Sequence, residues 1–144
     1  MGAVIKSKVV FMLGVFLGYL LVASVSFAAA APGLTRTNSG GGVTVNVTYP
    51  HSQNTEETRF EVVLDTHAVN LDGYDLETLS LLRDDSGKTY QPVRVENKGS
   101  GHHREITVVF PNVSPPAKRL ELVIKDIAGI KERSFLWELN DKKK

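Results

Sequence analysis

The 144-residue chain contains no cysteine, and its two methionines, Met1 and Met12, both lie near its start. Without cysteine the chain forms no disulfide and carries no lipid on a cysteine, which excludes a lipoprotein. Beyond Met12 it also lacks the thiolate and thioether ligands of cuprous copper sites. Its stability must therefore come from a hydrophobic core, and a metal site would have to use imidazole or oxygen ligands.

The sequence also lacks a strong charge of one sign and the common catalytic motifs. Its 17 Lys and Arg residues nearly balance 16 Asp and Glu residues, so the formal net charge is +1. Nucleic-acid binding normally requires a basic surface, and this composition does not predict one. There is no G-x-S-x-G motif, no cysteine nucleophile and no glycine-rich phosphate loop. We therefore expect a protein that is not an enzyme and does not bind nucleic acid.

Residues 1–30 fit a secretory signal peptide. Lys6 and Lys8 provide the positive start, residues 9–25 carry no charge, and an alanine-rich stretch up to Ala30 matches an A-x-A cleavage pattern. A retained membrane anchor is the alternative, because about 17 to 25 apolar residues can span a bilayer. The prediction is an exported protein, periplasmic or extracellular, with membrane contact only through an uncleaved signal segment.

The remaining chain divides into three parts. Residues 31–42 contain the stretch PGLTRTNSGGG, which combines turn-forming residues with few apolar ones and predicts a flexible leader. Residues 43–140 are expected to form one domain, and residues 141–144 a solvated basic tail. Loss of Lys6 and Lys8 with the signal would shift the net charge to about −1.

Alternating apolar residues predict an all-β domain. In residues 43–48 the three valines fall on one face and polar residues on the other, which is typical of a half-buried strand. Similar alternation occurs in residues 58–67, 105–110, 119–127 and 131–139. With two further strands, described next, this gives about seven short strands separated by turn signals. The pattern favours an immunoglobulin-like β-sandwich, with a small barrel as the alternative.

The middle of the chain, LDGYDLETLSLLRDDSGKTYQPVRVE, is less regular. We expect a short turn from Asp72 to Leu76 and a strand over residues 78–83. The turn sequence DDSGK then leads to a partner strand over residues 89–96. Pro92 marks that partner as an edge strand, because proline cannot donate to a ladder. The following NKGSGHH segment is predicted to be a loop.

The single tryptophan, Trp137, shares its strand face with Phe135 and Leu139. This register predicts that the indole is buried in the core, where a large ring removes much apolar area from water. The alternative is an exposed platform for stacking a sugar.

Four residues form a candidate metal site. Asp65 and His67 are two apart on a strand, so their side chains are expected on the same face. His102 and His103 lie in a glycine-containing loop, and either would approach Asp65 and His67 if the two strands are neighbours. Imidazole and carboxylate suit Zn²⁺ or Cu²⁺. The alternative is that His67 caps a strand end while His102 and His103 line a solvated loop.

Two acidic residues form an alternative calcium site. Asp72 and Asp75 flank Gly73 in a short loop, and calcium takes oxygen ligands from loops of this kind. However, the segment does not match the twelve-residue EF-hand pattern. Asp75 is equally suited to capping a helix, because aspartate side chains accept hydrogen bonds from nearby backbone N–H groups.

The segments LDTHAVNLDGYDL, LRDDSG and GHHR resemble a group of small exported bacterial and archaeal proteins of uncharacterised function. The resemblance covers residues 43–139 and implies no particular activity. The positions to which it draws attention are Asp65, His67, Asp72, Asp75, His102, His103 and Arg104.

These observations predict an exported, monomeric, non-catalytic binding module that holds a divalent metal ion through His and Asp side chains. The alternative is a structural or envelope-associated subunit whose exposed edge strand joins a neighbouring protein. The expected partner is accordingly a divalent metal ion or an envelope protein.

Overall fold

A computed structural model describes residues 34–50, 56–113 and 117–139 of the chain. The expected signal peptide, residues 1–30, and basic tail, residues 141–144, lie outside these ranges. In the described ranges, no helix is long and apolar enough to cross a membrane.

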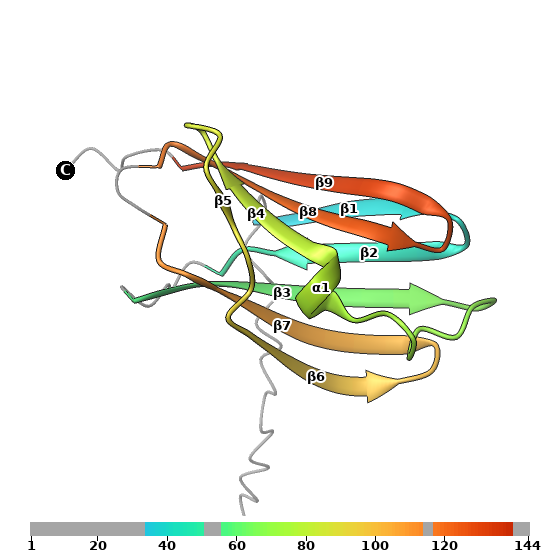
Figure 1. Ribbon diagram of the computed structural model, residues 1–144. Coiled ribbons are helices and arrows are strands. Elements are labelled where there is room, and N and C mark those ends of the chain that lie inside the picture. The colour runs from blue at the N-terminus through green and yellow to red at the C-terminus, as the bar shows by residue number, and fades with distance from the viewer. Residues whose placement is uncertain (1–33, 51–55, 114–116, 140–144) are drawn as a thin grey trace, which may run out of the picture.

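The described residues form nine strands and one short helix, arranged as two antiparallel sheets (Figure 1). The five-stranded sheet has the order β1-β2-β3-β7-β6, and the four-stranded sheet has the order β5-β4-β8-β9. This architecture is consistent with a β-sandwich. The elements are β1 (Thr35–Gly40), β2 (Val43–Thr48), β3 (Glu57–Thr66), α1 (Leu76–Leu79), β4 (Ser80–Asp84), β5 (Thr89–Tyr90), β6 (Arg94–Ser100), β7 (His103–Pro111), β8 (Arg119–Ile127) and β9 (Ile130–Glu138).

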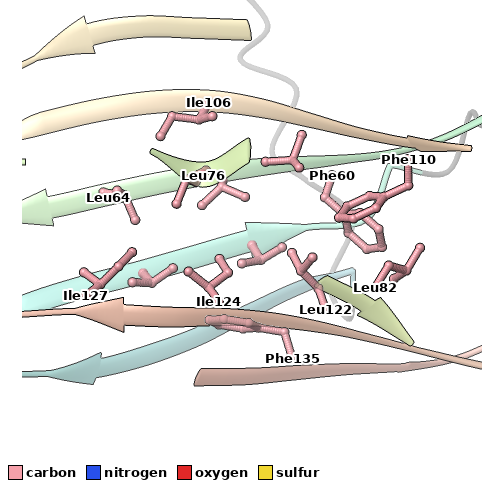
Figure 2. Close-up of a cluster of buried hydrophobic side chains, with 14 of the residues drawn as sticks. Phe60, Leu64, Leu76, Leu82, Ile106, Phe110, Leu122, Ile124, Ile127 and Phe135 are labelled. Carbon is pink, nitrogen blue, oxygen red and sulfur yellow. The ribbon is translucent and has the colours of Figure 1, made fainter. Parts of the chain in front are cut away.

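The core lies between the two sheets, and the period-two alternation of the sequence builds it. Each strand that has one apolar face turns that face inward, as the burial of alternate residues in β2 and β3 shows. Figure 2 shows apolar side chains from both sheets meeting in this layer, with Leu76 of α1 among them. Residues at the centre of the layer include Phe60, Leu64, Phe110, Leu122, Ile124 and Phe135.

The expectation of a flexible leader over residues 31–42 is wrong where the structure describes it. Residues 35–40 form β1, which pairs with β2 from Thr35 opposite Thr48 to Gly40 opposite Val43. Gly41 and Gly42 both have positive φ, as a two-residue type I′ hairpin turn requires. A Cβ atom on Gly41 would lie 2.1 Å from the carbonyl oxygen of Ala128. The hairpin turn, rather than any apolar side chain, makes this segment a strand.

The expected strand count of about seven is low for two reasons: β1 was missed, and the strand expected over residues 89–96 is divided. β5 belongs to the four-stranded sheet and β6 to the five-stranded sheet, with Pro92 in the connection between them. The segment predicted as a loop after residue 96 continues β6 to Ser100. Before β4, Asp75 caps α1 by accepting a hydrogen bond from the Glu77 N–H.

The open side of the sandwich between β1 and β9 is bridged by side chains. Trp137 is 2% exposed and donates its indole N–H to the Leu34 carbonyl at 2.7 Å, so the tryptophan belongs to the core and is not a sugar platform. Arg133 is 1% exposed and donates to the Asn38 side-chain oxygen and the Gly40 carbonyl, both at 2.7 Å. We refer to this region as the β1/β9 junction.

Candidate functional site

The predicted site residues gather around the β6–β7 hairpin at one end of the five-stranded sheet. Ser100 pairs with His103, so Gly101 and His102 form a two-residue turn. Gly101 has a φ of +72°, and a positive φ at the first central position is characteristic of a type II′ turn. His102 therefore lies in the turn, whereas His103 is the first residue of β7. The outer face of the sheet, which points away from the four-stranded sheet, carries His103.

Asp65 and His103 contact each other across β3 and β7. The two residues are directly paired in the register, and the His103 Nδ1 atom is hydrogen-bonded to an Asp65 carboxylate oxygen. The His103 Nε2 atom lies 3.3 Å from the Glu105 carboxylate. These two carboxylates, that of Asp65 first, raise the pKa of His103 above the ordinary value of 6.5. The arrangement holds the imidazole between two acids and favours its protonated form.

His67 and His102 do not join this pair. The sequence predicted that Asp65 and His67 share one face of a strand. β3 ends at Thr66, so His67 lies outside the strand and does not share that face. The His67 side chain is exposed and forms no hydrogen bond or ion pair with a described residue. His102 Nδ1 is instead hydrogen-bonded to the Val69 carbonyl at 3.1 Å. Over the described ranges, no group of three or more His, Cys, Asp or Glu residues is placed to hold a metal ion.

The two acids of the calcium alternative both bind backbone N–H groups. Asp72 accepts a hydrogen bond from the Gly101 N–H at 2.8 Å, which ties the segment after β3 to the β6–β7 turn. Asp75 accepts from the Glu77 N–H at 3.0 Å as the cap of α1. These hydrogen bonds account for both aspartates as local structural residues.

Arg104 is the residue that holds this region together, and the strand pattern alone did not identify it. It follows His103 in β7 and therefore points inward, where it is 7% exposed. Its guanidinium donates to the Leu71 and Tyr74 carbonyls at 2.6 and 2.8 Å and to the Asn97 side chain at 2.5 Å. The sequence feature that could have identified Arg104 is its position on the apolar face of a strand, between Ile106 and the turn formed by Gly101 and His102. Arg104 fixes the segment between β3 and α1 against β6 and β7.

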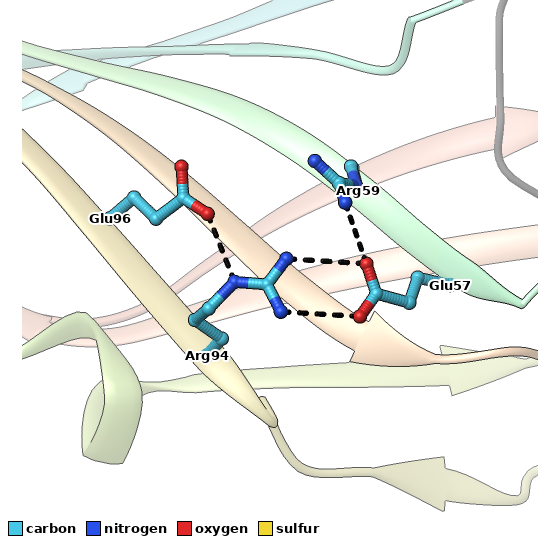
Figure 3. A network of polar contacts seen from close by, with 4 residues as sticks. All are labelled: Glu57, Arg59, Arg94 and Glu96. Atoms are coloured by element: carbon cyan, nitrogen blue, oxygen red, sulfur yellow. Dashed lines mark hydrogen bonds and ion pairs between the residues drawn. The ribbon is translucent and has the colours of Figure 1, made fainter.

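A second charged cluster lies on the same outer face, at the other end of β6 (Figure 3). Arg94 of β6 donates to both oxygens of Glu57 in β3, at 3.2 and 3.3 Å, and to Glu96 at 2.9 Å. Arg59 donates to Glu57 at 2.7 Å. The hydrogen bonds from Arg94 and then Arg59 lower the pKa of Glu57. The cluster connects β3 to β6 across the intervening strand β7.

An open groove of about 340 Å³ lies on the outer face, alongside both clusters. Glu61 and Lys98 line it, and neither side chain forms a hydrogen bond or ion pair with a described residue. Trp137 and Tyr90 are buried in the core and do not line the groove, so neither ring is available there for stacking a ligand. It presents carboxylates and an ammonium group to solvent, beside the edge of the sheet. The remaining lining residues are Val62, Val63, Glu96, Glu105, Ile106 and Thr107.

β6 forms the edge of the five-stranded sheet next to this groove. Its seven residues pair with β7 on one side and, within the described ranges, with no strand on the other (Figure 1). The other sheet edges differ: β5 has only two residues, and β1 and β9 are bridged to each other by side chains. An edge strand presents every second backbone N–H and C=O away from its neighbour. β6 is therefore the long, accessible edge of the described domain.

The chain was compared with protein-family models, with curated proteins and with solved structures, and none of them matches it.

Proposed function

We propose that the protein is an exported, non-catalytic interaction module that binds an extended segment of an envelope protein by adding it as a strand to β6. One observation carries this proposal: β6 is a seven-residue edge strand that has no neighbour beyond it in the described domain. Strand addition of this kind obtains affinity from backbone hydrogen bonds, and specificity from the alternating side chains that flank them.

The surroundings of β6 support recognition by charge. The outward side chains of β6 alternate in sign, as Arg94, Glu96 and Lys98. A strand added beside them would place its own alternate side chains opposite these charges, where opposite-charge pairs are favourable and like-charge pairs are unfavourable. The edge therefore favours a partner strand whose charges alternate in the complementary order.

We also propose that the domain is immunoglobulin-like and belongs to the group of small exported proteins that its sequence resembles. The strand order supports the first part. β2, β3, β7 and β6 take the order A-B-E-D of such domains, and β4, β8 and β9 take the order C-F-G. β1 and β5 would be additional edge strands. The signal-like N-terminal sequence supports export.

Titration with a strand-forming probe tests the proposed function. The probe is a synthetic seven-residue peptide with valine at alternate positions and Glu, Lys and Glu between them. We expect the backbone amide signals of residues 94–100 to shift in ¹⁵N-correlated NMR spectra, and their hydrogen exchange to slow, because an added strand pairs with the free edge.

The matched control is the same peptide with two of its valines replaced by proline. Proline has no N–H to donate to a ladder, so this peptide should leave the amides of β6 unchanged. The proposal is wrong if the first peptide perturbs no amides of β6, or if both peptides perturb them equally.

A second candidate function, binding of a divalent metal ion, is supported by the contact between Asp65 and His103. A carboxylate on Nδ1 orients a histidine so that Nε2 can bind a metal, an arrangement common in metal sites. Here Nε2 faces Glu105, which would supply an oxygen ligand. His103 and Glu105 would hold Zn²⁺ or Cu²⁺, with water in the remaining positions.

Calorimetric and thermal-shift titrations with Zn²⁺ and Cu²⁺ test this candidate. A bound ion raises the melting temperature, because a ligand that binds only the folded state stabilises it by mass action. His103→Ala should abolish the shift, while His67→Ala serves as the control and should retain it. No heat and no shift with the wild-type protein, or equal loss in both variants, would exclude a site at His103.

A further inference from the structure

We infer that the segment bound at β6 is the β6 strand of a second copy of this chain. The two strands would run antiparallel about a two-fold axis through Asn97. This inference rests on the proposed function, since it names the partner for the same edge. It uses three features of β6: its position at the edge, the order of its charges and the exposure of its side chains.

The proposed two-fold axis passes through the central residue of the strand. β6 runs from Arg94 to Ser100, so Asn97 is its central residue. In a two-fold symmetric interface, if one residue contacts a second residue of the other copy, the reverse contact also forms. An antiparallel pair centred on Asn97 places Glu96 directly opposite Lys98 of the second copy, twice.

The charges of β6 are self-complementary in this register. The Lys98 side chain has no hydrogen bond or ion pair within the described part of the chain, although Glu105 lies opposite it in the register of β6 with β7. Glu96 uses one carboxylate oxygen for Arg94, so its second oxygen is available. Both side chains point to the same outer face, where directly opposite residues of paired strands are neighbours. The dimer would contain two Glu96–Lys98 pairs and no directly opposed like charges.

The edge is accessible to a second copy. Figure 1 shows β6 at the limit of its sheet, with β7 on its inner side. Its residues are exposed except for Val95, which is half-buried, and no proline interrupts it. Gly99 has a φ of +81°, which departs from the extended conformation and limits the regular ladder to the centre of the strand. A contact through one short strand is smaller than an obligate interface, so we expect a weak, reversible association.

Sedimentation equilibrium over a range of protein concentrations, at low salt, tests the inference. The wild-type protein should show a reversible monomer–dimer equilibrium. Lys98→Glu places the introduced carboxylate opposite Glu96 of the second copy, and Glu96→Lys places the introduced ammonium group opposite Lys98. Each variant alone should associate about tenfold more weakly than wild type, because two attractive pairs become repulsive.

An equimolar mixture of the two variants is the decisive sample. In the mixed dimer each changed residue again faces an opposite charge, so the mixture should associate about as strongly as wild type. A folding defect in either variant would not be corrected by mixing. Lys131→Glu, which makes the same charge change at an exposed position of β9, is the matched control and should leave the association unchanged.

The inference is overturned if the wild-type protein stays monomeric at millimolar concentration, if Lys98→Glu associates as wild type does, or if the mixture fails to recover. A monomeric protein that still binds the strand-forming peptide at β6 would retain the proposed function and lose only the second copy as partner. A protein that shows neither behaviour would lose both.

Discussion

The two long sides of this domain are constructed differently. At the β1/β9 junction, the edges of both sheets are bridged by buried side chains, and Trp137 and Arg133 are each at most 2% exposed. Along β6 and the adjacent end of β7, the charged side chains lie at the surface, and the side chains of Arg94 and His103 are 43% and 54% exposed. Burial makes hydrogen bonds at the junction expensive to break, whereas solvent screens the charges around β6. The junction therefore contributes more to the stability of the fold, whereas β6 is an exposed sheet edge within the described domain.

Trp137→Ala should produce the largest loss of stability. The indole packs 5.1 Å from the Phe60 ring and 6.1 Å from the Tyr49 ring, measured between centroids, and bonds the Leu34 carbonyl. Removing a buried aromatic ring costs about 3 to 5 kcal/mol of the free energy of unfolding. Chemical denaturation measures this change. A midpoint equal to that of wild type would contradict the assignment of the ring to the core.

Arg133→Met should give the next largest effect at the same junction. Burial lowers the pKa of the Arg133 guanidinium, and its Nε atom has no hydrogen-bond partner among the described residues. Methionine fills part of the space but leaves the Asn38 and Gly40 oxygens without their donor, which should cost about 2 kcal/mol.

Hydrogen exchange of the β1 amides should accelerate in Arg133→Met more than exchange in β3, because β1 has no apolar side chain of its own. Arg133→Lys tests whether a positive charge at this position is enough to hold β1 in place. It should also be destabilised, since an ammonium group lacks the planar fork that reaches both oxygens. Uniform acceleration over all strands would show that Arg133 does not act on β1 in particular.

His103→Gln should give a smaller, pH-dependent effect on the β6 side. The pKa of His103 is raised in the folded protein by Asp65 and then Glu105. Its protonated form therefore contributes stability that is fully present below the unfolded value of 6.5 and is lost as the pH rises through the folded pKa.

The difference in melting temperature between wild type and His103→Gln should accordingly be larger at about pH 6 than at about pH 9. NMR titration of the imidazole provides the direct measurement. In Asp65→Asn the pKa of His103 should fall toward 6.5, and an unchanged titration would show that Asp65 does not set it.

Arg94→Gln should have the smallest effect on stability, within the error of denaturation experiments, because exposed ion pairs contribute little. The pKa of Glu57 is the sensitive measurement. It should rise toward the ordinary value of 4.5 when the hydrogen bonds from Arg94 are lost, while Arg59 continues to hold it somewhat lower. A large loss of stability would show that the cluster in Figure 3 is structural after all.

The sequence predicted the parts of the fold that depend on alternating apolar residues. Val43, Val45 and Val47 face the core as expected. β1 was missed because TRTNSG has no apolar residue, and it is placed by a glycine turn and by contacts with β9, nearly a hundred positions away. Contacts between residues so far apart in the chain do not produce a recognisable pattern in the local sequence.

The candidate site was predictable only in part, for a related reason. The sequence placed Asp65 and the GHH segment near each other on the condition that their strands were neighbours, and β3 and β7 do pair. Which histidine would meet Asp65 depended on the register, and register cannot be read from one strand alone. His67 lies beyond the end of β3, and turn geometry directs His102 to the Val69 carbonyl. Arg104 and Arg133 both lie on apolar strand faces, a rare pattern that could have identified them as buried, although no prediction used it.

The β1/β9 junction also sets the order in which the chain can finish folding. The Leu34 carbonyl and the Trp137 indole are 103 positions apart, and Asn38 and Arg133 are 95 apart. The earliest strand of the described domain therefore cannot reach its final contacts until the last strand has been synthesised. Contacts this distant in sequence slow folding. For the exported protein proposed above, this delay would allow the chain to pass through a translocation pore before its first and last strands make contact.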